Sequence, residues 1–169
     1  MTSRHSHVQF FRLVAGPIAA GLIVFVPASI PAFAQAAPAP YTADELAYQT
    51  GLSGATADVP ALFLEQDAMS ARVSAVDDTT DMDALQADLG ALKDRWQVVT
   101  DQIDALRTPA RYASASLHMQ IATQSYAIAY GYLATGLATA DAYDIGVGTS
   151  SIEGAKTRLN EAGAEFSVA

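Results

Sequence analysis

The clearest pattern in the chain is a series of apolar residues at alternating steps of three and four between residues 82 and 106. No polar residue interrupts it, and the other faces of the segment carry charges such as Asp88, Lys93 and Asp101. This spacing gives a helix one apolar stripe, which packs against partner helices at a shallow angle. We predict a helix about 37 Å long. The stripe consists of Met82, Leu85, Leu89, Leu92, Trp96, Val99, Ile103 and Leu106.

Two shorter helices are predicted before this segment. Thr42 and Glu45 have the spacing of a capping box, in which each side chain pairs with the backbone of the other residue, so a short helix begins there. Two glycines, Gly51 and Gly54, end it. A second helix follows over about residues 59–76, where a cap and an early proline precede an apolar face.

The preceding helix ends near Thr108, because Pro109 disfavours the helical conformation at the residue before it. A fourth helix is therefore predicted to begin after Pro109 and to cover about residues 110–139. Two apolar stripes run along this segment, and we interpret them as burial on more than one side of the helix. The main stripe is Tyr112, Ala115, Met119, Ala122, Tyr126, Ala129 and Leu133, and the second is Leu117, Ile121, Ile128 and Tyr132.

The last predicted helix begins at a plausible cap, Asp141, and again has apolar residues at steps of three and four. Three glycines, Gly146, Gly148 and Gly154, each cost up to about 1 kcal/mol relative to alanine in a helix. We therefore expect its first half to be the part that frays or kinks.

These elements predict an all-α fold. Four long helices joined by connections of a few residues run antiparallel to their neighbours, so we expect an up-down-up-down four-helix bundle preceded by the short helix. Residues 42–169 form this helical bundle domain, which is large enough to bury a core without disulfides or metals.

The N-terminus has the three parts of a secretory signal peptide. Residues 1–12 are basic and hold no acid, an apolar run follows over residues 13–30, and small residues come next. We predict a cleaved signal peptide over residues 1–34, followed by an alanine- and proline-rich linker over residues 35–41.

The site of cleavage follows from the small residues that signal peptidase requires. Ala32 and Ala34 fit a cut before Gln35, and Ala34 with Ala36 fits a second one two residues later. The alternative is an uncleaved anchor, since 18 apolar residues just reach the lower bound for a membrane span, although two prolines weaken that helix. We expect an exported bacterial protein, periplasmic or extracellular, with no stable membrane anchor after cleavage.

Composition and net charge exclude several classes of partner and of chemistry. The chain has 169 residues, 51% of them hydrophobic, with 18 acidic and 9 basic side chains and a net charge of −9. Cleavage removes Arg4 and Arg12, which leaves 7 basic residues and a net charge of −11. Nucleic acid and anionic lipid repel such a domain. The absence of cysteine excludes disulfides, thiolate metal sites, c-type haem attachment and a cysteine nucleophile.

The C-terminal half resembles a helical hairpin that recurs in uncharacterised exported bacterial proteins. The shared pattern is a leucine, a proline two or three residues later, an apolar or aromatic residue, a histidine near the start of the next helix, and a small-residue turn before the last helix. The resemblance implies the hairpin architecture, directs attention to His118, and implies no activity. It is carried by Leu106, Pro109, Tyr112, His118, Tyr126, Leu133, Gly136 and Asp141.

Metal and haem chemistry have little support in the sequence. His118 is the single histidine beyond the predicted signal peptide, and no Glu-x-x-His motif of a di-iron bundle is present. A haem held by His118 with Met69 or Met82 is the cofactor alternative, but methionine on a helix face usually fills a core. The acidic run over residues 77–88 is spaced like a calcium loop and has methionine where the loop needs glycine, so we interpret it as a solvated turn. We predict no metal and no cofactor.

Catalytic motifs are also missing from the sequence. No serine lies in a glycine-flanked elbow, no phosphate-binding glycine loop is present, and His118 is the sole candidate base. We therefore predict that the protein is not an enzyme.

The candidate ligand-binding residues are Tyr126, Tyr130, Tyr132 and His118. We favour packing in the core and at its boundary as the role of the tyrosines. The alternative is that tyrosines with neighbouring glycines line a cleft for an apolar or aromatic ligand. For His118 we favour a hydrogen bond that bridges two helices over a ligand-binding or catalytic role.

We predict an exported, noncatalytic binding or interaction protein that acts through its last two helices. Its partner would be another protein or a small apolar ligand, and its apolar helix faces could also pair two copies into a homo-oligomer. The alternatives are a carrier of a small apolar ligand or haem, and a hydrolytic enzyme.

Overall fold

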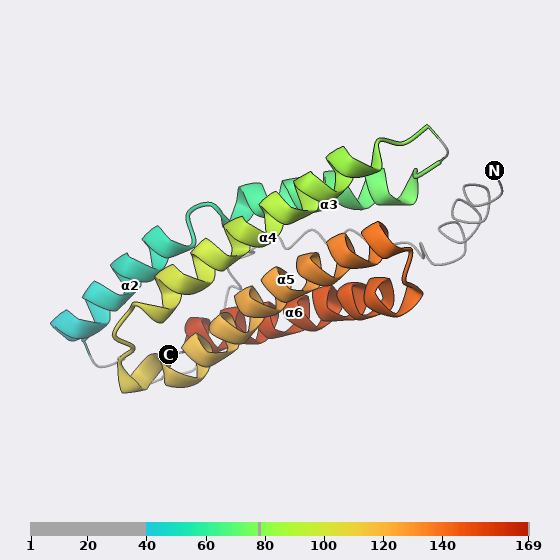
Figure 1. Cartoon of the computed structure of the whole chain (residues 1–169). Coiled ribbons are helices and arrows are strands. Elements are labelled where there is room, and N and C mark those ends of the chain that lie inside the picture. Colours follow the sequence, from blue (N-terminus) through green and yellow to red (C-terminus); the bar gives the residue numbers. More distant parts are fainter. Residues whose placement is uncertain (1–39, 78, 169) are drawn as a thin grey trace, which may run out of the picture.

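The computed structural model describes residues 40–77 and 79–168, and every regular element in them is a helix, which confirms the all-α class (Figure 1). The predicted signal peptide and residues 35–39 of the predicted linker lie outside the described residues. The elements are α2 (Ala43–Ala55), α3 (Val59–Ser74), α4 (Met82–Asp104), the 3-10 helix η1 (Ala110–Tyr112), α5 (Ala113–Thr139) and α6 (Ala142–Val168).

Helices α2 and α3 follow one another along α4 and run antiparallel to it (Figure 1). Gly51 of α2 lies beside Leu106, just past the end of α4. Farther along, Arg72 near the end of α3 forms an ion pair of 2.5 Å with Asp88 near the start of α4. The short helix is therefore packed along the bundle and does not merely precede it.

Helices α4, α5 and α6 also pack as antiparallel neighbours (Figure 1). Trp96 of α4 stacks on Tyr126 of α5, and Lys93, earlier in α4, lies beside Gly131, later in α5. Between α5 and α6, Leu133 lies beside Gly148.

Side-chain caps explain where the helices begin. Both bonds of the predicted capping box form between Thr42 and Glu45, and the backbone hydrogen bond from Thr42 holds the pKa of Glu45 below its usual value. Asp81 accepts a bond of 3.0 Å from the backbone N–H of Ala84 and caps α4. Asp77 accepts from the side chain and backbone of Thr79, which lowers the pKa of Asp77. The acidic run is thus a turn followed by a helix cap, as predicted.

The apolar stripe of α4 forms the centre of the core, in the predicted register. Trp96 is fully buried, and the two residues at the ends of the stripe, Met82 and Leu106, are half-buried. The other buried members are Leu85, Leu89, Leu92, Val99 and Ile103.

The interpretation of the two stripes on α5 was half wrong. Its main stripe is buried apart from the half-buried Met119, but the second stripe faces solvent, with exposed fractions of 52% for Leu117, 38% for Ile121, 48% for Ile128 and 39% for Tyr132. These residues lie opposite Tyr126 on the helix, whereas α5 packs on α4 and α6. The other buried residues of α5 include Ser116, Thr123, Ala127 and Tyr130.

Helix α6 is continuous from Ala142 to Val168, so its three glycines do not divide it. Fraying or a kink in its first half stays a prediction. Near its end, Phe166 packs against Tyr48 and Tyr112, whose rings stack with centroids 5.4 Å apart. The Tyr112 hydroxyl accepts a hydrogen bond of 2.6 Å from Gln49. This aromatic group joins α2, η1 and α6 at one end of the fold.

Candidate functional site

The four predicted ligand-binding residues do not form one site. Tyr126 and Tyr130 are completely buried, whereas Tyr132 points to solvent on the opposite side of α5. His118 lies at the junction of α5 and α6. Only Tyr126 and Tyr130 lie together, because residues four apart share one face of a helix.

The tyrosine-rich part of α5 lacks the room that its glycines suggest. A Cβ on Gly136 would lie 2.9 Å from the backbone nitrogen of Ile145, and one on Gly131 would touch the side chain of Lys93. Gly136 therefore allows α6 to approach α5 closely, and the side chain of Lys93 lies against Gly131, so neither glycine opens a cleft for a ligand.

The hydroxyl groups of Tyr126 and Tyr130 are buried and have no hydrogen-bond partner among the described residues. Burial, reinforced by the carboxylate of Glu153, raises the pKa of Tyr126 far above its usual value. Burial also raises the pKa of Tyr130, with smaller effects from Tyr126 and the carboxylate of Asp67. Both phenols are therefore neutral at physiological pH and can donate as well as accept a hydrogen bond.

Helix α3 brings more polar atoms to the same level of the interior. Because α3 and α5 are both antiparallel to α4, they run parallel to one another. Phe63 of α3 packs edge-on against Tyr126 with ring centroids 5.9 Å apart. Gln66, one turn after Phe63, therefore lies at the level of Tyr130, one turn after Tyr126. Gln66 is buried, and its Oε1 atom has no partner among the described residues.

Two further buried polar groups lie on α3 and α4. The hydroxyl of Ser70, one turn beyond Gln66, and the indole N–H of Trp96 are buried and have no hydrogen-bond partner among the described residues. We define the inner polar cluster as Gln66, Ser70, Trp96, Tyr126 and Tyr130.

The cluster holds both donors and acceptors next to aromatic rings. A buried polar group without a hydrogen bond costs about 1–3 kcal/mol, so each gains substantially when a polar atom of a guest molecule reaches it. Sequence reasoning missed Gln66. The signal was available, because Gln66 is a polar residue between Leu62 and Met69 on the apolar face of the second predicted helix.

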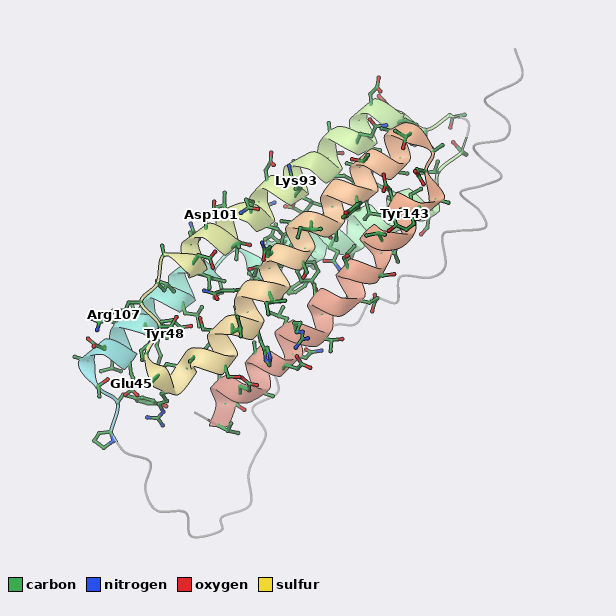
Figure 2. The ribbon with its side chains drawn as sticks, turned by 60° about the horizontal axis from the view of Figure 1, so that its bottom comes forward. Glu45, Tyr48, Lys93, Asp101, Arg107 and Tyr143 are labelled. Atoms are coloured by element: carbon green, nitrogen blue, oxygen red, sulfur yellow. The ribbon has the colours of Figure 1, made fainter. Side chains whose placement is uncertain are left out.

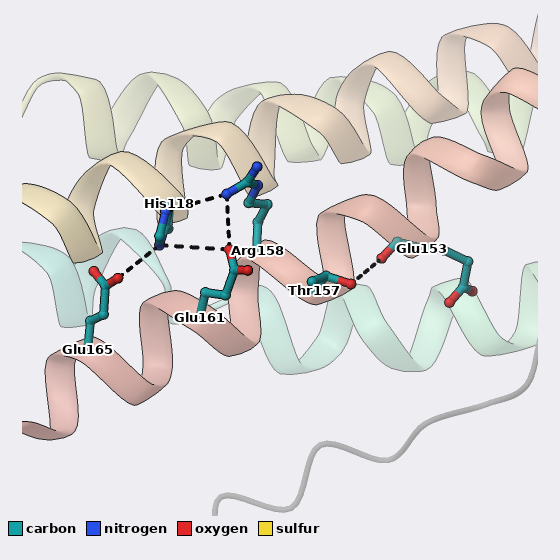
Figure 3. Close-up of polar contacts among 6 residues, drawn as sticks. All are labelled: His118, Glu153, Thr157, Arg158, Glu161 and Glu165. Atoms are coloured by element: carbon teal, nitrogen blue, oxygen red, sulfur yellow. Dashed lines mark hydrogen bonds and ion pairs between the residues drawn. The ribbon is translucent and has the colours of Figure 1, made fainter.

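His118 of α5 bridges to α6 through a hydrogen bond with Arg158, as predicted, and through contacts with two carboxylates (Figure 3). Its Nδ1 atom lies 3.3 Å from Oε1 of Glu165 and 3.9 Å from Oε2 of Glu161. On the other side of the ring, Nη1 of Arg158 lies 3.5 Å from Nε2 and 3.1 Å from the Glu161 carboxylate. The guanidinium already supplies a positive charge to the Glu161 carboxylate, which disfavours a metal ion there.

The described residues contain no group of three or more histidine, aspartate or glutamate side chains arranged to hold a metal. Of the two methionines proposed as a haem ligand beside His118, Met82 has no geometric basis. Met82 lies 14 residues before Trp96, and His118 lies 8 residues before Tyr126 on an antiparallel helix. These positions are about 33 Å apart along the helices.

Replacing His118 with glutamine is expected to leave the helical content unchanged and to lower the free energy of unfolding by about 1 kcal/mol or less. The contacts of His118 are partly exposed, and such ion pairs contribute little to stability. Urea denaturation followed by circular dichroism would measure this change. Zinc, copper or haem bound stoichiometrically to the wild type and lost in the variant would contradict the structural role.

Comparisons of the chain with family models, curated proteins and solved structures find no match. The resemblance of its C-terminal half to exported helical hairpins remains a prediction. None of the helices in residues 40–77 and 79–168 combines the length and hydrophobicity that a membrane crossing requires.

Proposed function

We propose that the chain is an exported, noncatalytic binding protein that holds a small ligand inside an up-down-up-down helical bundle, at the inner polar cluster. The observation that carries this proposal is that the hydroxyls of the buried Tyr126 and Tyr130, at the level of the buried Gln66, have no hydrogen-bond partner in residues 40–77 and 79–168. Native proteins leave few buried polar groups without a partner, so these hydroxyls call for one, and a bound ligand would supply it.

The bundle architecture and the export are separate parts of the proposal. The antiparallel contacts of α2 and α3 with α4, of α4 with α5, and of α5 with α6 support the up-down-up-down arrangement. Export is supported by the basic, apolar and small-residue segments over residues 1–34.

The surroundings of the cluster define the class of ligand. The rings of Phe63, Trp96 and Tyr126 pack against one another beside the hydroxyls and make the surroundings apolar and aromatic. The carboxylates of Asp67 and Glu153 act electrostatically on the two hydroxyls and oppose an anion. The ligand class is therefore a small organic molecule with an apolar or aromatic body and neutral or cationic polar groups.

Removing only the hydroxyl from the two core tyrosines tests the proposal. Native mass spectrometry of protein recovered from the envelope of its own host is expected to show a bound small molecule on the wild type. Tyr126→Phe and Tyr130→Phe should lose most of that bound mass. After the ligand is stripped by unfolding and refolding, both variants should be at least as stable as the wild type, because each loses an unpartnered buried group.

Tyr112→Phe is the matched control. Its hydroxyl has a partner, Gln49, so this variant should retain the ligand and lose about 1 kcal/mol of stability. A wild type that carries the polypeptide mass alone, or a bound mass that survives both core substitutions, would contradict the ligand site. The same spectra report the mature N-terminus, expected at Gln35 or Ala37, and protein that retains residues before Leu13 would contradict cleavage.

A further inference from the structure

The second apolar stripe of α5 faces solvent, and we define Leu117, Ile121, Ile128 and Tyr132 as the outer stripe. It extends over about 23 Å of the helix. Helix α5 holds no aspartate, glutamate, lysine or arginine anywhere in its length, although the whole chain has a net charge of −9. An exposed apolar face of this kind, without charges, is typical of an interface with another protein.

We propose that the outer stripe is the interface between two copies of this chain, with their α5 helices antiparallel. The spacing of the stripe carries this proposal. Leu117 and Tyr132 lie equally far from the midpoint between residues 124 and 125, and so do Ile121 and Ile128. A two-fold axis through that midpoint therefore sets Leu117 against Tyr132 of the second copy, and Ile121 against Ile128. Such a surface is complementary to itself, as a symmetric dimer requires.

The distribution of charge favours a second copy of the chain as the partner that covers the outer stripe. Two acidic chains repel one another unless the surfaces that meet are free of like charges, and α5 meets this condition. A basic partner would instead require carboxylates on this surface to pair with its positive charges, and the outer stripe has none. Adsorption to an anionic membrane would need several lysine or arginine side chains along the apolar face, and α5 itself supplies none.

The neighbouring edge of α4 adds charge complementarity. Lys93 lies beside Gly131 of α5, and Figure 2 shows Lys93 and Asp101 along α4. The two-fold axis places Gly131 of one copy at the same height along the helices as His118 of the second copy. Because α4 and α5 are antiparallel, the α4 residue at that level is Asp104, which follows Lys93 and Asp101 on the same stripe of the helix. Lys93 of one copy thus faces Asp104 of the other.

Analytical ultracentrifugation of the mature chain from about 1 μM to about 1 mM tests the interface, because mass action shifts a weak dimer over such a range. The wild type is expected to convert from monomer to dimer. Ile128→Glu should weaken association at least 10-fold, since it places a carboxylate in the apolar stripe of both copies, and should leave the helical circular dichroism unchanged. Leu64→Glu is the matched control, because Leu64 is 70% exposed on α3 and should associate like the wild type.

The absence of cysteine allows a test of the register by disulfide formation. Chains carrying Ile121→Cys are expected to cross-link on oxidation with chains carrying Ile128→Cys, and neither should cross-link well with itself, because the identical positions are offset by about 10 Å along the helices. Preferential self-linking of each variant would indicate parallel helices and overturn the proposed pairing. A wild type that stays monomeric over the whole range, or control and test variants that weaken association equally, would overturn the interface.

Discussion

Replacing Trp96 with alanine is expected to lower the free energy of unfolding by about 3–5 kcal/mol. Trp96 is fully buried in the middle of the α4 stripe. Its indole stacks on the ring of Tyr126 with centroids 4.2 Å apart, and Phe63 packs edge-on against it at 5.7 Å. The truncation therefore removes the contact that joins α3, α4 and α5 and leaves a cavity among side chains that cannot fully collapse into it.

Urea denaturation followed by circular dichroism would measure the loss, with Val98→Ala as the matched control. Val98 lies two residues from Trp96 in α4 but is 54% exposed, so its truncation should change stability by less than about 0.5 kcal/mol. If Trp96→Ala does not fold, Trp96→Phe gives a smaller measurable loss in the same direction. Equal losses for Trp96→Ala and Val98→Ala, or fluorescence of the native wild type typical of an exposed indole, would contradict this register of α4.

Helix α4 could be predicted closely because its apolar and charged residues are well separated around the helix. The uninterrupted spacing from Met82 onward fixed its buried face, and the structure buries the middle six members of the stripe. The start of α4 was also predictable, because Asp81 supplies a local cap that depends on no distant residue.

Helix α5 shows where the pattern of apolar and polar residues fails to predict which side chains are buried. It has no fully charged side chain to mark a solvated face, and alanine is compatible with either environment. Small polar residues, Ser116 and Thr123, are buried, while the large apolar Leu117 and Ile128 are exposed. The buried faces are set by the positions of α4 and α6, and these follow from tertiary packing.

The candidate site was predictable in part. Tyr126 and Tyr130 are four residues apart and share a face, whereas Tyr132 is six residues from Tyr126 and lies about 240° around the helix. Helical geometry alone was therefore enough to separate Tyr132 from the other two. The polar partners on α3 required the structure, because nothing local in the sequence places Gln66 at the level of Tyr130.

Replacing Gly148 with alanine is expected to lower the free energy of unfolding by about 1–3 kcal/mol, although alanine is the better helix former. A Cβ at this position would lie 2.7 Å from Cγ of Leu133 and 2.9 Å from the backbone oxygen of Ala129. The backbone oxygen cannot move without shifting α5 itself. The clash therefore outweighs the gain in helix propensity, which amounts to about 1 kcal/mol or less.

Two glycines of the same helix are matched controls. A Cβ on Gly146 or Gly154 would meet nothing within 4 Å, so Gly146→Ala and Gly154→Ala should raise stability by about 0.5–1 kcal/mol. Thermal and urea unfolding of the three variants should thus give changes of opposite sign within one helix. Because the close approach at Gly148 fixes the rotation of α5 against α6, it also determines that Ile128 faces solvent while Tyr126 faces the interior. A stabilising Gly148→Ala would contradict that packing and remove the structural basis of the outer stripe and the inner polar cluster together.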